Sequence, residues 1–338
     1  MLRRCAQRSS VSPLHSVWMS SHLGITAQQQ ARNYSSHHQP HHPLPKTFGV
    51  VGAGQMGGGI ALVAAMNAKI PSVRVHDVSA QSIEKCKKLI QTLLDKYVQK
   101  GTLTAEERQV ILSERLSFSS GTDLSKLALG CEFIVEAATE QTELKLGLFK
   151  DLSQMVHSNN SAETSKTILA TNTSSISITK IASQTLDPST VIGMHFMNPV
   201  PVMTLVEIIR GLQTSDETYE RTTQLAHAMH KTCTLSIKDS PGFIANRILM
   251  PYINEAVNVL HEGIATVEDI DKTMKLGTNV PMGPLTLADF IGLDTCLAIM
   301  RVLYTEFADS KYRPSPLLVK MVEAGWLGKK TGRGFYKY

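Results

Sequence analysis

The residue types best suited to acid–base chemistry lie in the segment Gly193-Met194-His195-Phe196-Met197-Asn198-Pro199 and at Glu207. Histidine has an ordinary pKa of roughly 6.5, so it can take up and release a proton near neutral pH. A buried carboxylate beside the ring would orient it and stabilise its charged form. A histidine on an apolar strand is more often a hydrogen-bonded core residue, so this segment alone leaves a structural role open.

Two apolar runs must position these side chains, one from Val191 to Phe196 and the other from Val202 to Ile209. They predict two strands joined by a turn at Asn198-Pro199. Neighbouring strands would bring His195, near the end of the first, against Glu207 in the second.

A glycine-rich turn, Gly52-Ala53-Gly54-Gln55-Met56-Gly57, follows the apolar strand Phe48 to Val51 and precedes a helix. In such a turn the glycines permit a tight bend, close approach of the backbone to a pyrophosphate, and packing of the helix on the sheet. Asp77 ends the next predicted strand, where its carboxylate would accept hydrogen bonds from ribose hydroxyls and repel a 2′-phosphate. The pattern predicts an NAD site; FAD binding and a turn without ligand are the alternatives.

Strands and helices alternate through the first part of the chain. Further buried strands are predicted at Phe133 to Ala137 and Ile168 to Thr171, and a long helix at Ile83 to Tyr97. A capping box at Thr104 and Glu107 predicts the start of another helix. The alternation predicts an α/β Rossmann-like, doubly wound sheet domain over residues 46–238.

Helical patterns dominate beyond Asp239-Ser240-Pro241-Gly242. They predict a smaller all-α domain over residues 239–338. Its helices are expected at Phe243 to Glu262, after Thr266, after Pro284, at Ile291 to Phe307 and at Ser315 to Ala324.

The N-terminal segment has a different composition, since residues 1–76 contain no acidic side chain. Its four arginines before Lys46, among many serines, are typical of a mitochondrial transit peptide. We therefore expect residues 1–45 to be a transit peptide and disordered linker, with a matrix location; a tail without function is the alternative. Because these arginines carry most of the formal net charge of +5, the charge gives no support for nucleic-acid binding.

Other classes of protein are disfavoured by composition. The chain has no apolar run of 18 residues, so no membrane span is expected. The five cysteines are scattered, which argues against a disulfide framework and a zinc site, and no metal is predicted.

Two further polar segments are candidates for the site: Ala170-Thr171-Asn172-Thr173-Ser174-Ser175 and the run from Asp239 to Arg247 that contains Asn246. The first follows a predicted strand, and doubly wound sheets bind ligands at the carboxyl ends of their strands. Helix capping is an equally good explanation for the first segment. For Asn246 the alternative is a polar residue on the face between the domains.

Together, and in this order, the segments resemble the 3-hydroxyacyl-CoA dehydrogenase family, with short-chain mitochondrial members in particular, from about Lys46 to Tyr338. The resemblance extends to Glu136-Ala137, Pro281-Met282-Gly283-Pro284 and Lys329 to Tyr336. It implies NAD-dependent oxidation of an L-3-hydroxyacyl-CoA to a 3-ketoacyl-CoA in β-oxidation. It also implies a helical domain that closes over the site and forms a homodimer.

The resemblance assigns roles to residues. His195 is expected to be the general base, with Glu207 as its orienting partner, while Ser174 and Asn246 surround the reacting oxygen. Cofactor contacts are expected at Glu140, Lys145, Asn198 and Lys330. Lys100 is a candidate for the CoA phosphates, although a solvated lysine is about as good an explanation, and Leu93 replaces a serine that the family places near CoA. The alternatives are a related hydroxy-acid dehydrogenase, of the 3-hydroxybutyryl-CoA or the sugar-acid type, and an NAD-binding protein without turnover.

Overall fold

The structure, a computed structural model, describes residues 42–157 and 166–338. The predicted transit peptide and linker lie outside the described residues, except for residues 42–45.

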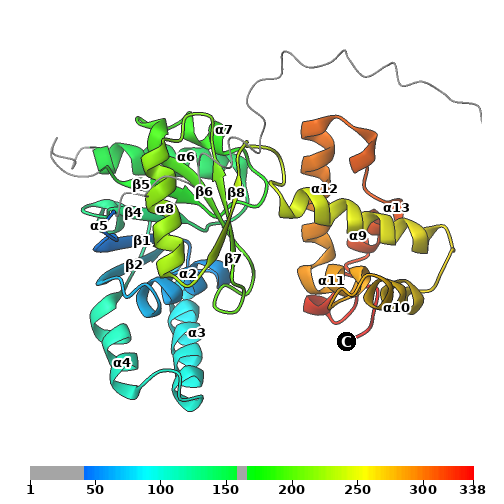
Figure 1. The fold of residues 1–338 in the computed structure, drawn as a ribbon, viewed down its shortest axis with the longest axis horizontal. Helices are drawn as coiled ribbons and strands as arrows, with labels where there is room; N and C mark the ends of the chain where they lie inside the picture. Colours follow the sequence, from blue (N-terminus) through cyan, green and yellow to red (C-terminus); the bar gives the residue numbers. More distant parts are fainter. Residues whose placement is uncertain (1–41, 158–165) are drawn as a thin grey trace, which may run out of the picture. The chain divides into compact units, whose positions relative to one another are not determined.

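Eight strands form one sheet, in the order β3-β2-β1-β4-β5-β6-β7-β8, with helices on both faces (Figure 1). All neighbouring strands are parallel except β6 and β7, which are antiparallel. The strands are β1 Thr47–Val51, β2 Ser72–Asp77, β3 Leu116–Ser120, β4 Phe133–Glu136, β5 Ile168–Thr171, β6 Val191–Phe196, β7 Leu205–Arg210 and β8 Thr232–Ser236. The predicted Rossmann-like sheet domain is confirmed.

The central strands are buried on both faces, as the apolar runs predict for parallel strands covered by helices. In β4, Phe133 and Val135 belong to one core cluster and Ile134 belongs to another, since successive side chains point to opposite faces. The first cluster includes residues of α2 (Gln55–Met66), α3 (Ala80–Gln99) and α8 (Asp216–Ala228). The second includes residues of α5 (Ser125–Ala128), α6 (Thr142–His157) and α7 (Ile178–Ala182).

Two strands were not predicted, β3 and β8, and both lie at the edges of the sheet. Their sequences, LSFSS and TCTLS, are mostly polar, with exposed and half-buried residues in both strands, so they lack an apolar run. Helix α4 (Ala105–Val110) begins with the predicted capping box of Thr104 and Glu107, and leads into a short π-helical turn, Ile111–Arg115.

Helices make up the rest of the described chain: α9 Ala245–His261, α10 Val267–Gly277, α11 Pro284–Ile291, α12 Leu293–Phe307 and α13 Pro316–Glu323. They share a separate core, in which Met250, Ile270 and Leu297 are buried. Helix α12 begins after Gly292, whose φ of 104° breaks the predicted helix from Ile291. The all-α character is confirmed, and none of the described helices is long and apolar enough to cross a membrane.

Candidate active site

His195 and Glu207 lie opposite each other on the antiparallel strands β6 and β7. The His195 Nδ1 is 2.8 Å from the Glu207 Oε2. Both side chains are buried, with 8% and 1% of their residue surface exposed. A carboxylate can only accept, so the ring donates from Nδ1 and leaves Nε2 as the basic nitrogen. The predicted strand–turn–strand arrangement is confirmed, and the two residues are within hydrogen-bond reach.

The second oxygen of Glu207 is also occupied. Its Oε1 accepts hydrogen bonds from the backbone N–H groups of Ile244, at 3.0 Å, and Ala245, at 2.9 Å. These groups lie at the start of α9, where the backbone donors have no partner within the helix. A buried carboxylate is stable only if donors compensate it, and Glu207 has three.

Asn172 follows β5 and holds the neighbouring strand in place. Its Oδ1 accepts a hydrogen bond of 2.8 Å from the backbone N–H of Phe196, the residue after His195. The N-cap of α7 is Ser177. The segment from Asn172 to Ser175 therefore does not provide the N-cap of α7.

Ser174 contacts two other candidate residues, Glu140 and Asn246. Its backbone N–H and its Oγ donate to the Glu140 Oε1, at 2.8 and 3.0 Å. The Asn246 Nδ2 donates to the backbone carbonyl of Ser174 at 3.3 Å. The structure therefore brings together Ser174 and Asn246, as predicted. In this arrangement the hydroxyl proton of Ser174 is directed at Glu140, and donation to a ligand would require it to turn away from that carboxylate.

Glu140 and Lys145, expected to contact a cofactor, belong to a network within the protein. The Lys145 side chain is 1% exposed, and its Nζ lies 2.6 Å from the Glu136 Oε1 and 3.3 Å from the Glu140 Oε2. Desolvation raises the pKa of Glu140, but the Lys145 ammonium and the donors on Thr173 and Ser174 outweigh it, so the pKa is below its ordinary value of 4.5. Glu140 is thus held as a carboxylate by groups beside the candidate site.

The glycine-rich turn has the geometry that a dinucleotide requires. Gly52 has a φ of 100°, which favours glycine. A Cβ on Gly57 would lie 1.8 Å from the carbonyl oxygen of Gly52, so the helix packs directly on the strand. Gly54 is different, because a Cβ there would meet no described atom within 4 Å. It is the N-cap of α2 and provides no side-chain cap, so the first N–H groups of the helix remain available for an anion.

Asp77 ends β2 beside this turn. Its Oδ2 accepts a hydrogen bond of 2.8 Å from the backbone N–H of Ala53, and its Oδ1 accepts one of 2.8 Å from Ser79. These contacts fix the carboxylate at the carboxyl end of β2, and each oxygen retains a lone pair for a ribose hydroxyl. The residues present therefore fit NAD.

The other residues predicted to contact the cofactor or CoA have different surroundings. The Lys330 Nζ is paired with Asp294, at 2.5 and 2.7 Å from its two oxygens. Lys100 lines a cavity of about 310 Å³ together with Leu93, Gln55 and Pro199. Asn198 forms a cis peptide bond with Pro199. Within the described ranges, no cluster of three His, Cys, Asp or Glu side chains could hold a metal ion.

Comparison with known proteins identifies the family. The profile of the 3-hydroxyacyl-CoA dehydrogenase NAD binding domain matches residues 47–240, and that of the C-terminal domain matches residues 242–338. The chain belongs to the 3-hydroxyacyl-CoA dehydrogenase family. It is an oxidoreductase that uses NAD, as the resemblance and the glycine-rich turn predicted.

Individual relatives agree with this assignment. A probable 3-hydroxybutyryl-CoA dehydrogenase of Deinococcus radiodurans is 54% identical over 86% of this chain and 99% of its own length. The 3-hydroxybutyryl-CoA dehydrogenase of Bradyrhizobium diazoefficiens is 48% identical over 87% of this chain and 95% of its own. The crystal structure of (S)-3-hydroxybutyryl-CoA dehydrogenase from Ralstonia eutropha has a TM-score of 0.80 and 48% identity, covering 87% of this chain and 99% of that one.

The predicted location in the mitochondrial matrix is wrong on this comparison. These relatives are bacterial proteins, and bacteria have no such compartment. The prediction depended on the composition of the N-terminal segment, and a composition that is rich in Ser and Arg and poor in acids is shared by segments with no targeting role.

Sequence reasoning missed two residues that contact the site. Glu136 was noted only as part of the family resemblance, yet it is fully buried and accepts hydrogen bonds from Lys145 and from the Thr171 Oγ1. Phe243 belonged to the candidate run from Asp239 to Arg247 and was expected to begin a helix, but no role at the site was predicted for it; its ring centroid lies 5.9 Å from that of His195. An acid at the end of an apolar strand was a usable signal for Glu136. The ring contact of Phe243 depends on a backbone conformation that its residue type does not indicate.

Proposed function

We propose that this dehydrogenase oxidises the 3-hydroxyl of a short-chain L-3-hydroxyacyl-CoA to a ketone, with His195 as general base. The buried hydrogen bond between the His195 Nδ1 and the Glu207 Oε2 carries the proposal. It makes Nε2 the proton acceptor, and it provides a negative charge beside the imidazolium that forms when the proton is taken.

The proton moves between the substrate and the ring. The His195 Nε2 removes the proton of the 3-hydroxyl as C3 loses its hydride, and in the reverse direction the imidazolium returns it. NAD, when bound, would supply the hydride acceptor; the turn from Gly52 to Gly57 would hold its diphosphate, and Asp77 would accept hydrogen bonds from its ribose. Asn246 and Ser174 lie against each other near this chemistry, which supports a role for both in positioning the oxygen on C3.

The remaining contacts are part of the same proposal. Asn198, Glu140, Lys145 and Lys330 would contact the cofactor, the last after leaving Asp294. Lys100 would pair with a phosphate of CoA at the 310 Å³ cavity, whose walls include Leu93. The names of the relatives support a four-carbon acyl group, and a thioester substrate over a free sugar acid. The corresponding reaction sequence is the β-oxidation of short acyl chains.

A change at His195 tests the catalytic assignment. His195→Gln should lower kcat by about 10²–10⁴-fold in an NADH absorbance assay with acetoacetyl-CoA, because no other group would exchange the proton. NAD affinity, measured by fluorescence quenching, should remain nearly unchanged. The control is His227→Gln at an exposed position of α8, which should keep full activity. Near-normal turnover by the His195 variant would remove this residue from the mechanism.

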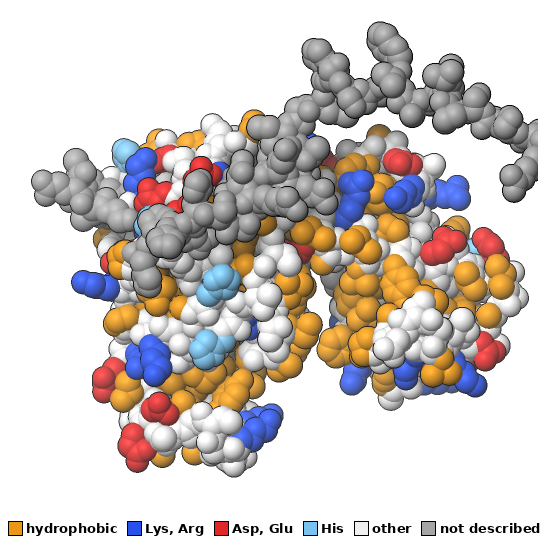
Figure 2. Space-filling model, in the orientation of Figure 1, with side chains coloured by type: hydrophobic (Ala, Val, Ile, Leu, Met, Phe, Trp, Pro, Cys, Tyr) orange, Lys and Arg blue, Asp and Glu red, His pale blue; other side chains and the backbone are white. Residues whose placement is uncertain are grey.

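We also propose that residues 46–238 bind the cofactor, and that residues 239–338 close over the substrate and form a homodimer. The helical part carries a cavity of about 960 Å³ that Ile264, Ile270 and Met274 help to line. Ile264 is 67% exposed, and apolar side chains gather on the surface of this part that Figure 2 shows. A second copy would cover this apolar surface.

Size-exclusion chromatography with light scattering tests the dimer. The wild-type protein should have twice the mass of one chain, and Ile264→Lys should shift the measured mass toward that of the monomer. The control is Lys272→Ala on the same part of the chain. A monomeric wild-type protein at micromolar concentration would contradict the proposal.

A further inference from the structure

The backbone has an unusual conformation where the chain passes from β8 to α9. Gly242 has a φ of 75°, and Phe243 follows with a φ of 51°. Glycine adopts this left-handed region freely, but for an aromatic residue the contact of its Cβ with the backbone makes it unfavourable. Such a conformation persists only where the surrounding contacts hold it.

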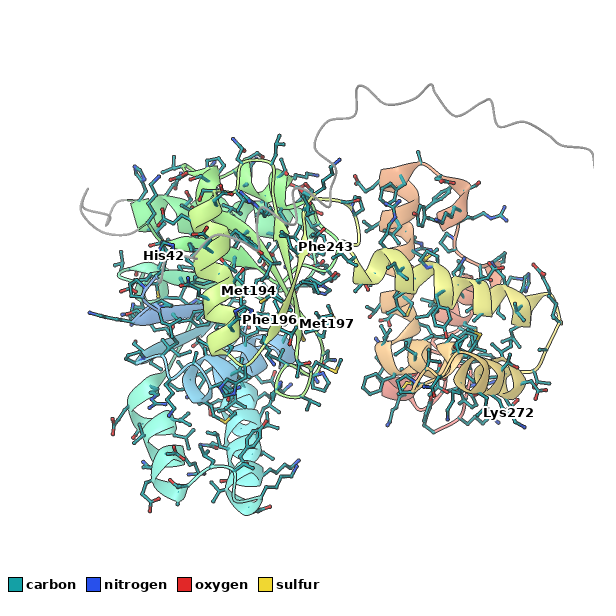
Figure 3. All side chains as sticks on the ribbon, in the orientation of Figure 1. His42, Met194, Phe196, Met197, Phe243 and Lys272 are labelled. Atoms are coloured by element: carbon teal, nitrogen blue, oxygen red, sulfur yellow. The ribbon has the colours of Figure 1, made fainter. Side chains whose placement is uncertain are left out.

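The Phe243 side chain is held in the core of the sheet domain. It is 4% exposed and belongs to the same core cluster as Ile178, Val191 and Ile209. Figure 3 shows Phe243 at this connection. Its ring meets that of His195 at an interplanar angle of 61°, an edge-to-face contact.

The residues after Phe243 touch the other members of the site. The N–H groups of Ile244 and Ala245 donate to the Glu207 Oε1, and the Asn246 side chain donates to Ser174. A short segment therefore contacts the candidate base, its carboxylate and the candidate serine. The left-handed turn at Phe243 determines the direction in which this segment leaves the core.

We propose that Phe243 is a positioning residue for the His195–Glu207 pair. Its ring packs beside the imidazole and limits the access of water to the hydrogen bond at Nδ1. Its backbone conformation directs the two N–H groups to the second carboxylate oxygen. The inference rests on the proposed role of His195 as the base.

Phe243→Leu tests this, with Phe149→Leu as the matched control. Phe149 is a fully buried phenylalanine of the same core cluster, on α6. Both substitutions should lower the melting temperature to a similar extent, because both remove a buried ring. Only Phe243→Leu should lower kcat, by roughly 10- to 100-fold, and it should do so with little change in KM.

The pH profile distinguishes positioning from simple loss of stability. In Phe243→Leu the pH of half-maximal kcat should fall, because a loosened hydrogen bond to Glu207 stabilises the imidazolium less. Phe243→Tyr keeps the ring and should restore kcat and the profile. If Phe243→Leu matches Phe149→Leu in kcat and pH profile while His195→Gln is inactive, the positioning role is wrong and the proposed function stands. If His195→Gln is active, the proposed function itself fails.

Discussion

Two regions of this protein contain buried carboxylates, and the hydrogen-bond donors to these carboxylates differ between the regions. In the sheet domain, Glu207 gives one oxygen to a histidine ring and the other to backbone donors. In the helical part, Asp289 accepts from the N–H groups of Phe335 and Tyr336 and from the Tyr338 hydroxyl. Burial is nearly equal, at 1% exposed for both residues.

The comparison shows that burial does not mark a carboxylate as functional. Glu207 differs from Asp289 in its partner, because the partner of Glu207 is an imidazole, a group that can gain or lose a proton near neutral pH. The partners of Asp289 are fixed donors, and they anchor the C-terminal segment that carries Lys330. We therefore expect changes at Glu207 to affect the chemistry and changes at Asp289 to affect the fold.

The largest effect is expected for Glu207→Gln. The amide can donate to the His195 Nδ1 and would favour the tautomer with the proton on Nε2, which cannot act as a base. The kcat should fall by about 10²–10⁴-fold, while circular dichroism remains that of the folded protein. A variant with near-normal kcat would place Glu207 in the same structural class as Asp289.

Asp289→Asn should mainly reduce stability. The amide is neutral and keeps one acceptor oxygen where the carboxylate has two, so at least one donor from the C-terminal segment loses its acceptor. The free energy of unfolding, measured in urea, should decrease by about 1–3 kcal/mol. At a temperature where the variant is folded, kcat should change much less than in Glu207→Gln. A loss of kcat without a loss of stability would break the comparison.

High pH should destabilise the helical part through two tyrosines near the C-terminus. Burial and the neighbouring Asp271 raise the pKa of Tyr336 to about 12, and burial and Asp289 raise the pKa of Tyr338 to about 12. The neutral phenols are thus favoured by the fold, and their contribution is full below pH 10 and lost as the pH rises toward 12. The melting temperature of the wild type should fall more steeply over this range than that of the double variant Tyr336→Phe, Tyr338→Phe. Equal slopes would show that ionisation of the two phenols does not cause the loss of stability at high pH.

The smallest effect is expected at acid pH from Glu140. Its pKa is lowered, chiefly by Lys145 against the opposing effect of desolvation, so its contribution to stability is present above pH 4.5 and lost as the pH falls through the lowered pKa. Glu140→Gln should flatten the acid limb of the melting temperature, measured from pH 5 downward. Because the side chain is partly exposed, we expect the change to be small. An unchanged acid limb would assign the acid sensitivity to other carboxylates.

The central fold and the His195–Glu207 contact were predictable because they depend on apolar periodicity. Two apolar runs around a proline-containing turn indicated adjacent strands that could bring His195 against Glu207, and the structure supplies the register that pairs them. The edge strand β8 was not predicted, since only Cys233 and Leu235 of its five residues are apolar, and so short an alternation gives a weak signal. The contacts of Lys145 and Phe243 depend on which atoms meet across the fold. A lysine that pairs with Glu136 in the interior has the same local sequence signature as one on the surface.

Gly54 is a position where the described fold itself does not require a glycine. Gly57 is glycine because the neighbouring carbonyl leaves no space, whereas no described atom restricts Gly54. A methyl group at Gly54 should therefore be tolerated by the protein alone. The selective pressure for glycine at this position would come from the diphosphate, so Gly54→Ala offers a way to weaken cofactor capture while leaving the architecture intact.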